Sequence, residues 1–74
     1  MKLYRITVIT PSLNIERGVW AEYMQVKDGQ IIFIEVVDGE EGIFEKAVAV
    51  YPVNYTLITS IETKEDYDKR KSSI

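Results

Sequence analysis

Glu22 and Glu35 are the residues of this 74-residue chain that could perform acid–base chemistry as a pair. If the segments around them form a hairpin, their carboxylates lie opposite each other, with Lys46 alongside. Paired carboxylates can act as general acid and general base, as in glycoside hydrolysis. Such a row is also typical of a salt-bridge network that faces solvent or a partner. We favour this second interpretation, because the chain lacks other catalytic residue types.

The composition excludes most other catalytic and metal chemistry. The chain contains no histidine and no cysteine, so the commonest general base at neutral pH and every thiolate nucleophile or ligand are missing. Asp38, Glu40 and Glu41 could hold a hard cation, but their spacing matches no calcium-binding loop, and an exposed turn explains them better. We therefore expect a protein that is not an enzyme and uses neither a cofactor nor a metal.

Charge and hydropathy limit the partners. Twelve acidic and nine basic residues give a formal net charge of −3 at pH 7. An acidic body repels phosphate backbones, which makes a nucleic-acid partner unfavourable. The chain has no apolar run long enough to cross a bilayer, and its first residues lack the features of a signal peptide. We expect a cytoplasmic protein that does not bind membranes.

The element that would position both glutamates is a hairpin over residues 19–37. Asp28-Gly29 separates two runs rich in β-branched and aromatic residues, which is the strongest short-range signal for a hairpin. Both central residues of a type I′ turn have positive φ, which glycine adopts freely and aspartate tolerates. The predicted register is Val26 with Ile31, Met24 with Phe33, Glu22 with Glu35, and Trp20 with Val37.

Further strands are predicted on either side of this hairpin. Residues 2–10 alternate in polarity and form the first strand. Residues 11–18 form a loop, whose Leu13 and Ile15 either close one end of the core or belong to a binding surface. The last two strands cover residues 43–51 and 55–62.

The register between the third and fourth strands is set by charge. Pairing Val37 with Phe44 places Glu35 opposite Lys46, whereas the neighbouring register would place it opposite Glu45. Like charges directly opposite each other are unfavourable, so we predict the first register. It continues with Phe33 opposite Val48 and Ile31 opposite Val50.

The turn between the last two strands resembles a turn of a known family. Tyr51-Pro52-Val53-Asn54-Tyr55 is similar to the Pro-x-Asn-Tyr turn of SH3 domains, where a short 3₁₀ turn joins the fourth strand to the fifth. The order of elements is also similar. The resemblance implies an SH3-like barrel and a groove for proline-rich peptides lined by Pro52 and Tyr55. In size, lack of cysteine and charged tail, the chain is similar to small proteins of phages and mobile elements.

The predicted fold is one small all-β domain over residues 1–62, either a five-stranded antiparallel meander or an SH3-like barrel. Thr63 is a capping residue followed by acidic side chains, and residues 69–71 are basic. This distribution suits a short helix, although residues 63–74 have little apolar surface. A short charged helix and a disordered tail remain alternatives for this segment.

The small core favours self-association. A 74-residue domain buries only roughly 60–65% of the surface that its unfolded chain exposes, and without disulfides or metals a partner subunit is the remaining means of stabilisation. The third predicted strand is apolar on both faces, so it is central or faces a partner. We expect a protein-binding module that forms homo-oligomers. Its contact residues are expected to include Trp20, Tyr23, Ile32 and Ile34.

Two other functions remain open. The chain could bind a small molecule, such as a nucleotide or metabolite, at a subunit interface that contains Trp20, Tyr23 and Arg5. It could also be a barrel that binds single-stranded nucleic acid, for which residues 69–71 would supply the positive charge.

Overall fold

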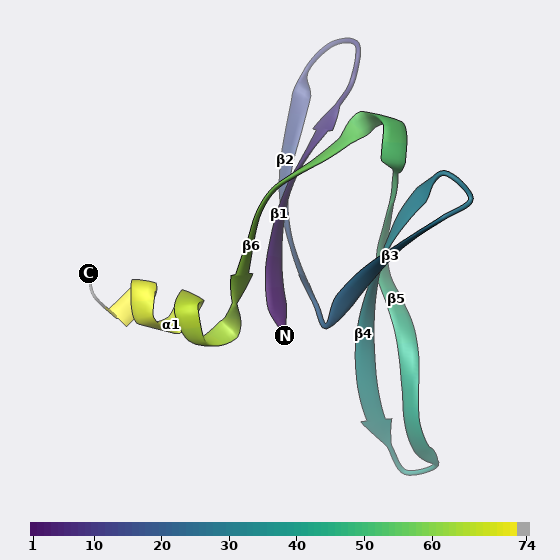
Figure 1. Ribbon diagram of the computed structural model, residues 1–74, viewed down its shortest axis with the longest axis vertical. Coiled ribbons are helices and arrows are strands. Elements are labelled where there is room, and N and C mark those ends of the chain that lie inside the picture. Colours follow the sequence, from purple (N-terminus) through teal and green to yellow (C-terminus); the bar gives the residue numbers. More distant parts are fainter. Residues whose placement is uncertain (73–74) are drawn as a thin grey trace.

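The computed structural model describes residues 1–72 and contains two three-stranded antiparallel sheets and a C-terminal helix (Figure 1). Sheet A has the strand order β2-β1-β6 and sheet B the order β3-β4-β5. The elements in chain order are β1 (Lys2–Ile9), β2 (Asn14–Ala21), β3 (Tyr23–Lys27), β4 (Gln30–Gly39), β5 (Gly42–Pro52), the 3₁₀ helix η1 (Val53–Tyr55), β6 (Thr56–Thr63) and α1 (Lys64–Ser72).

The all-β class with a short C-terminal helix is confirmed, but the predicted five-stranded meander and SH3-like barrel are wrong. The described chain has six strands, and no ladder joins an edge of one sheet to the other in residues 1–72. The last strand, β6, pairs with β1, so both ends of the β region meet in sheet A. Two sheets therefore face each other as open layers.

The added strand arises because the chain turns at Glu22. Residues 14–18, predicted as a loop, belong to β2 and pair with β1. Trp20 consequently pairs with Leu3 and not with Val37, and Glu22 does not pair with Glu35. Pairing with β1 satisfies the backbone of this mostly polar segment, which its own sequence pattern does not predict.

The turn of the β3–β4 hairpin is confirmed. Asp28 and Gly29 both have positive φ, 53° and 75°, as a type I′ turn requires. The ladder pairs Lys27 with Gln30 and continues to Tyr23 with Ile34, with the intervening residues in the predicted register.

The β4–β5 register is correct at one end and wrong at the other. Val37 pairs with Phe44 and Glu35 with Lys46, as predicted. A β-bulge then shifts the register between Phe33 and Ile34, so that Phe33 pairs with Ala49 and Ile31 with Tyr51. The bulge adds one residue to β5, which re-aims the following side chains. Val48 and Val50 are therefore left 40% and 48% exposed.

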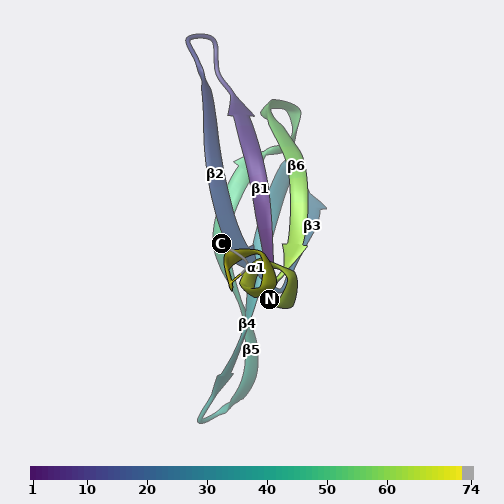
Figure 2. The same cartoon turned by 90° about the vertical axis from the view of Figure 1, so that its left-hand side faces the viewer.

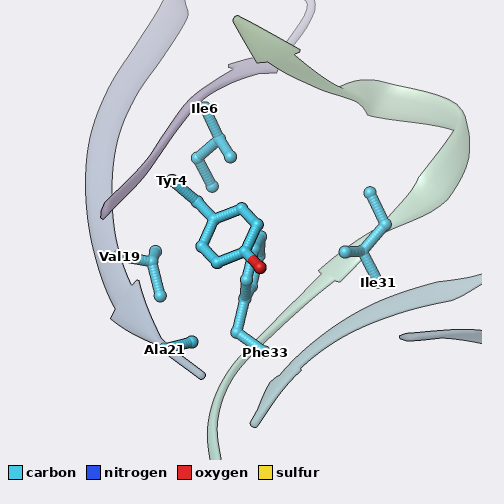
Figure 3. Packing of buried hydrophobic residues seen from close by; sticks show 6 residues of the cluster. All are labelled: Tyr4, Ile6, Val19, Ala21, Ile31 and Phe33. Carbon is cyan, nitrogen blue, oxygen red and sulfur yellow. The ribbon is translucent and has the colours of Figure 1, made fainter. Parts of the chain in front are cut away.

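The core lies between the two sheets. Tyr4 and Ile6 of β1 point toward Phe33 and Ile31 of β4, and β2 contributes Val19 and Ala21 (Figure 3). Phe33 is fully buried, and its ring centroid lies 5.1 Å from that of Tyr4. This cluster is what holds sheet A against sheet B, since burial of large apolar side chains is the main stabilising term of a fold.

Leu13 does not close the core. It is 57% exposed in the loop after β1, so the prediction that it packs beneath that loop is wrong. Ile15 is half-buried on β2.

Of the two alternatives for the C-terminal segment, the structure shows the helix: α1 covers Lys64–Ser72. Residues 73 and 74 lie outside the described residues. The Thr63 hydroxyl accepts a hydrogen bond from the Asp66 N–H at 3.1 Å, which caps the first turn. The helix packs on the outer side of sheet A.

The molecule is flat and extended (Figure 2). Its principal extents are 43 × 38 × 15 Å and its radius of gyration is 14.1 Å. A compact chain of this length has a radius of gyration of about 11 Å. The excess comes from hairpins that project beyond the core, with β4–β5 reaching past the rest of the molecule in both views.

Candidate functional site

The side of sheet B that faces away from sheet A carries an uncovered apolar surface. Met24, Phe33 and Tyr51 contact the core, so the residues that alternate with them point outward. We call this surface the outer face of sheet B; it consists of Tyr23, Gln25, Ile32, Ile34, Ala47 and Val50. In residues 1–72, neither sheet A nor α1 covers it.

Tyr23, Ile32 and Ile34 come together on this face. Tyr23 pairs with Ile34, which pairs with Ala47, and Ile32 pairs with Val50 across the next rung. Ile34 is only 4% exposed between its neighbours, whereas Ile32 and Tyr23 are half-buried. The result is a largely apolar face across all three strands, interrupted on β3 by the exposed Gln25 opposite Ile32.

A carboxylate lies beside Tyr23 at one end of the face. The Glu45 carboxylate raises the pKa of the Tyr23 phenol above its ordinary value of 10.0, mainly through a side-chain hydrogen bond, with desolvation and charge repulsion adding to the effect. The Tyr23 phenol and the Glu45 carboxylate are therefore neighbours at this end of the face. The Glu45 carboxylate keeps its charge and is exposed, so a partner packed on the apolar part of the face has to leave this end in contact with water.

Pro52 and Tyr55 lie elsewhere. They line an apolar hollow of about 290 Å³ with Val8, Ile9 and Pro11, where β1 ends beside η1. The Thr56 hydroxyl donates a hydrogen bond to the carbonyl of Pro52 at 2.7 Å, which fixes the turn. Tyr55 is 59% exposed.

Trp20 belongs to a third location, on the outer side of sheet A beneath α1. Its ring meets that of Tyr67 edge to face, with centroids 5.0 Å apart. It lines neither the hollow at Pro52 nor the outer face of sheet B. The six residues predicted to bind partners are thus divided among three surfaces.

The hollow between β6 and α1 is the most polar of these places. It measures about 470 Å³ and is lined by Arg5, Ser60, Ile61, Glu62, Asp66 and Arg70. Arg70 donates to both carboxylate oxygens of Glu62, at 2.9 and 3.0 Å, and this pairing lowers the pKa of Glu62 and raises that of Arg70. Arg5 and Trp20 are both on sheet A but Tyr23 is on sheet B, so one chain does not assemble the three-residue ligand site considered above.

The glutamate row is broken. The Glu22 carboxylate lies 3.5 Å from the terminal ammonium of Met1, and Glu35 pairs in register with Lys46. The ladder that was predicted to place the two glutamates opposite each other therefore ends before Glu22. In the part of the chain that the structure describes, no group of three or more acidic, histidine or cysteine side chains could hold a metal ion. The described helices include none with the length and apolar character of a membrane span.

Comparison of the chain with protein-family models, curated proteins and solved structures gives no match. The site therefore rests on its geometry. Sequence reasoning missed the exposure of Val48 and Val50, because the Ala-Val-Ala-Val repeat around them looks the same in either register.

Proposed function

We propose that this protein is a non-enzymatic protein-binding module that forms a two-fold dimer through the outer face of sheet B. The observation that carries the proposal is the amount of exposed surface. The accessible area is 5488 Å², whereas a compact monomer of 8.5 kDa exposes about 4,650 Å². The excess is similar to the roughly 800 Å² that each partner contributes to a standard protein interface.

The chemistry of the face favours a second copy as the partner. A two-fold interface brings the same surface patch together on both subunits, so the patch must complement itself. The outer face of sheet B meets this need because it is largely apolar, with Gln25 beside Ile32 and the Glu45 carboxylate beside Tyr23 as its polar neighbours. Two such sheets can stack face to face at about 10 Å.

A non-enzymatic role is supported by the residue types and their placement. The chain has no histidine or cysteine, and the strand ladder does not pair Glu22 with Glu35. The apolar surfaces of the described chain suit protein contacts better than turnover of a substrate.

Sedimentation velocity at micromolar concentration tests the proposal. Val50→Lys is the variant of choice, because Val50 is 48% exposed and the chain can fold with a lysine there, whereas Ile34 is buried. The unmodified protein is expected at twice the chain mass of 8.5 kDa, and Val50→Lys at the chain mass. Leu57→Lys, at a 55% exposed apolar position on β6, is the matched control and should remain dimeric.

Two results would contradict the dimer. One is a single 8.5 kDa species for the unmodified protein at every concentration. The other is equal dissociation by Val50→Lys and Leu57→Lys, which would show a general effect of added charge and not a specific face.

A further inference from the structure

The outer half of β4 has an unpaired edge. β4 runs over Gln30–Gly39, but β3 pairs only with its first half, up to Ile34. Residues 35–39 pair with β5 on one side and with no strand of the described chain on the other. We call residues 35–39 the free edge of β4; in Figure 1 it lies where β4 and β5 continue beyond β3.

The fold itself keeps this edge open. The N–H of Glu22 donates to the carbonyl of Ile34 at 2.8 Å, and there the chain turns from sheet B into β2 of sheet A. No later segment in residues 1–72 returns to this edge, and the β4–β5 hairpin projects past the other strands (Figures 1 and 2). Unpaired N–H and C=O groups on such an edge can accept another strand.

The projecting hairpin is strongly acidic. Residues 35–46 contain five carboxylates and one cationic side chain, a net charge of −4 on a chain whose total is −3. The carboxylates are Glu35, Asp38, Glu40, Glu41 and Glu45 and the cation is Lys46. Apolar side chains lie among them: Val36, Ile43 and Phe44 are 41%, 74% and 53% exposed.

We propose that the free edge of β4 binds a basic, extended segment of a partner protein by adding it as a further strand of sheet B. Main-chain hydrogen bonds supply affinity in this mode, and side chains supply specificity. Five residues of edge span about 17 Å, enough for a partner strand of similar length. Lysine or arginine side chains on that strand would lie beside the carboxylates of β4, and apolar ones beside Val36 and Val37.

The charge pattern argues against a second copy of this chain at the same edge. Antiparallel pairing of two free edges about Val37 would place Asp38 of each copy opposite Val36 of the other and Glu35 opposite Gly39, so the carboxylates of the edge would meet no lysine or arginine. A second copy would add carboxylates to an edge that is already acidic, whereas a basic strand would compensate their charge. The edge and the outer face of sheet B are thus separate surfaces, and this inference does not depend on the proposed dimer.

Binding of a labelled model peptide tests the inference. The probe is fluorescein-labelled Lys-Val-Lys-Val-Lys-Val-Lys, measured by fluorescence anisotropy against the full chain. Two control peptides carry glutamate in place of lysine, or N-methyl groups on alternate amides that keep the charge but prevent a ladder. We expect the basic peptide to bind and the glutamate peptide not to bind. The N-methylated peptide should bind with at least tenfold weaker affinity than the basic peptide.

Variants and amide shifts locate the contact. Asp38→Lys should weaken binding at least tenfold, whereas Glu16→Lys, the same charge change on the exposed side of β2, should leave it within twofold. Amide chemical-shift changes in the unmodified protein should concentrate in residues 35–39, which keeps the test decisive even if Asp38→Lys fails to fold. Val50→Lys should bind the peptide unchanged, separating this site from the dimer face.

The inference is overturned by any of three results: no binding of the basic peptide, equal binding of the N-methylated peptide, or shift changes centred outside the β4–β5 hairpin. Equal weakening by Asp38→Lys and Glu16→Lys would likewise show only non-specific attraction to an acidic protein.

Discussion

Trp20 of β2 and Tyr67 of α1 meet edge to face, with ring planes at 89° and centroids 5.0 Å apart. This contact fixes the helix to sheet A beside Leu3, which is 5% exposed and pairs with Trp20 on one side and Glu62 on the other. Arg70 adds its pair with Glu62. Since α1 has no buried residue of its own, these few contacts decide whether it stays docked.

Tyr67→Ala should undock the helix. The aromatic contact alone contributes about 0.5–1.5 kcal/mol, and a nine-residue helix without packing is marginal in water. We expect faster amide exchange across Lys64–Ser72 and a red-shifted emission of Trp20, the only tryptophan, with the β-sheet signal retained. Glu65→Gln, on the exposed side of α1, is the control and should change neither reading. Unchanged exchange in Tyr67→Ala would show that the ring contact does not hold the helix.

Docking of α1 should also depend on pH through Glu62. Arg70 holds the pKa of Glu62 below its ordinary value of 4.5, so the folded chain binds this proton more weakly than the unfolded chain does. The stabilising contribution is therefore complete above about pH 4.5 and is lost as the pH falls through the lowered pKa of the folded state. The near-ultraviolet circular dichroism of Trp20 and Tyr67 should report this loss. In Glu62→Gln this circular dichroism signal should be small at every pH. Parallel pH profiles for the two proteins would contradict the assignment of the pH dependence to Glu62.

Local chemistry made part of this fold predictable from sequence. Asp28-Gly29 specified its turn because few residue pairs adopt positive φ at both positions. The pairing of Glu35 with Lys46 was predictable because the alternative register would place two carboxylates, Glu35 and Glu45, directly opposite each other. The same registers placed Tyr23, Ile32 and Ile34 on one face before the structure did.

The rest depended on contacts between distant segments. No glycine or proline marks the turn at Glu22, and the alternation of apolar residues continues through it. The local sequence therefore does not predict that this strand is divided between two sheets. The bulge at Val48 lies in a repeat of small apolar residues that fits more than one register. Because the chain divides at Glu22, Trp20 belongs to sheet A and does not lie with Tyr23, Ile32 and Ile34 as predicted.

The β3–β4 turn also supports a distant part of the chain. The carbonyl of Gly29 accepts a hydrogen bond from the N–H of Val53 at 2.9 Å, which ties the turn to η1. Gly29 has a φ of 75°, and a β-carbon built there would meet no atom within 4 Å. A substitution at this position is therefore opposed by backbone strain and not by crowding.

Gly29→Ala should lower the free energy of unfolding by about 1–2 kcal/mol, the penalty for an alanine in the left-handed region. Asp28→Asn should be nearly neutral, because asparagine adopts that region at least as readily as aspartate. Urea unfolding of both variants checks the difference. Strain at Gly29 should also loosen the bond to η1, so the amide of Val53 should exchange faster in Gly29→Ala than in Asp28→Asn. Equal stability of the two variants would mean that the hairpin relaxes into another turn without loss.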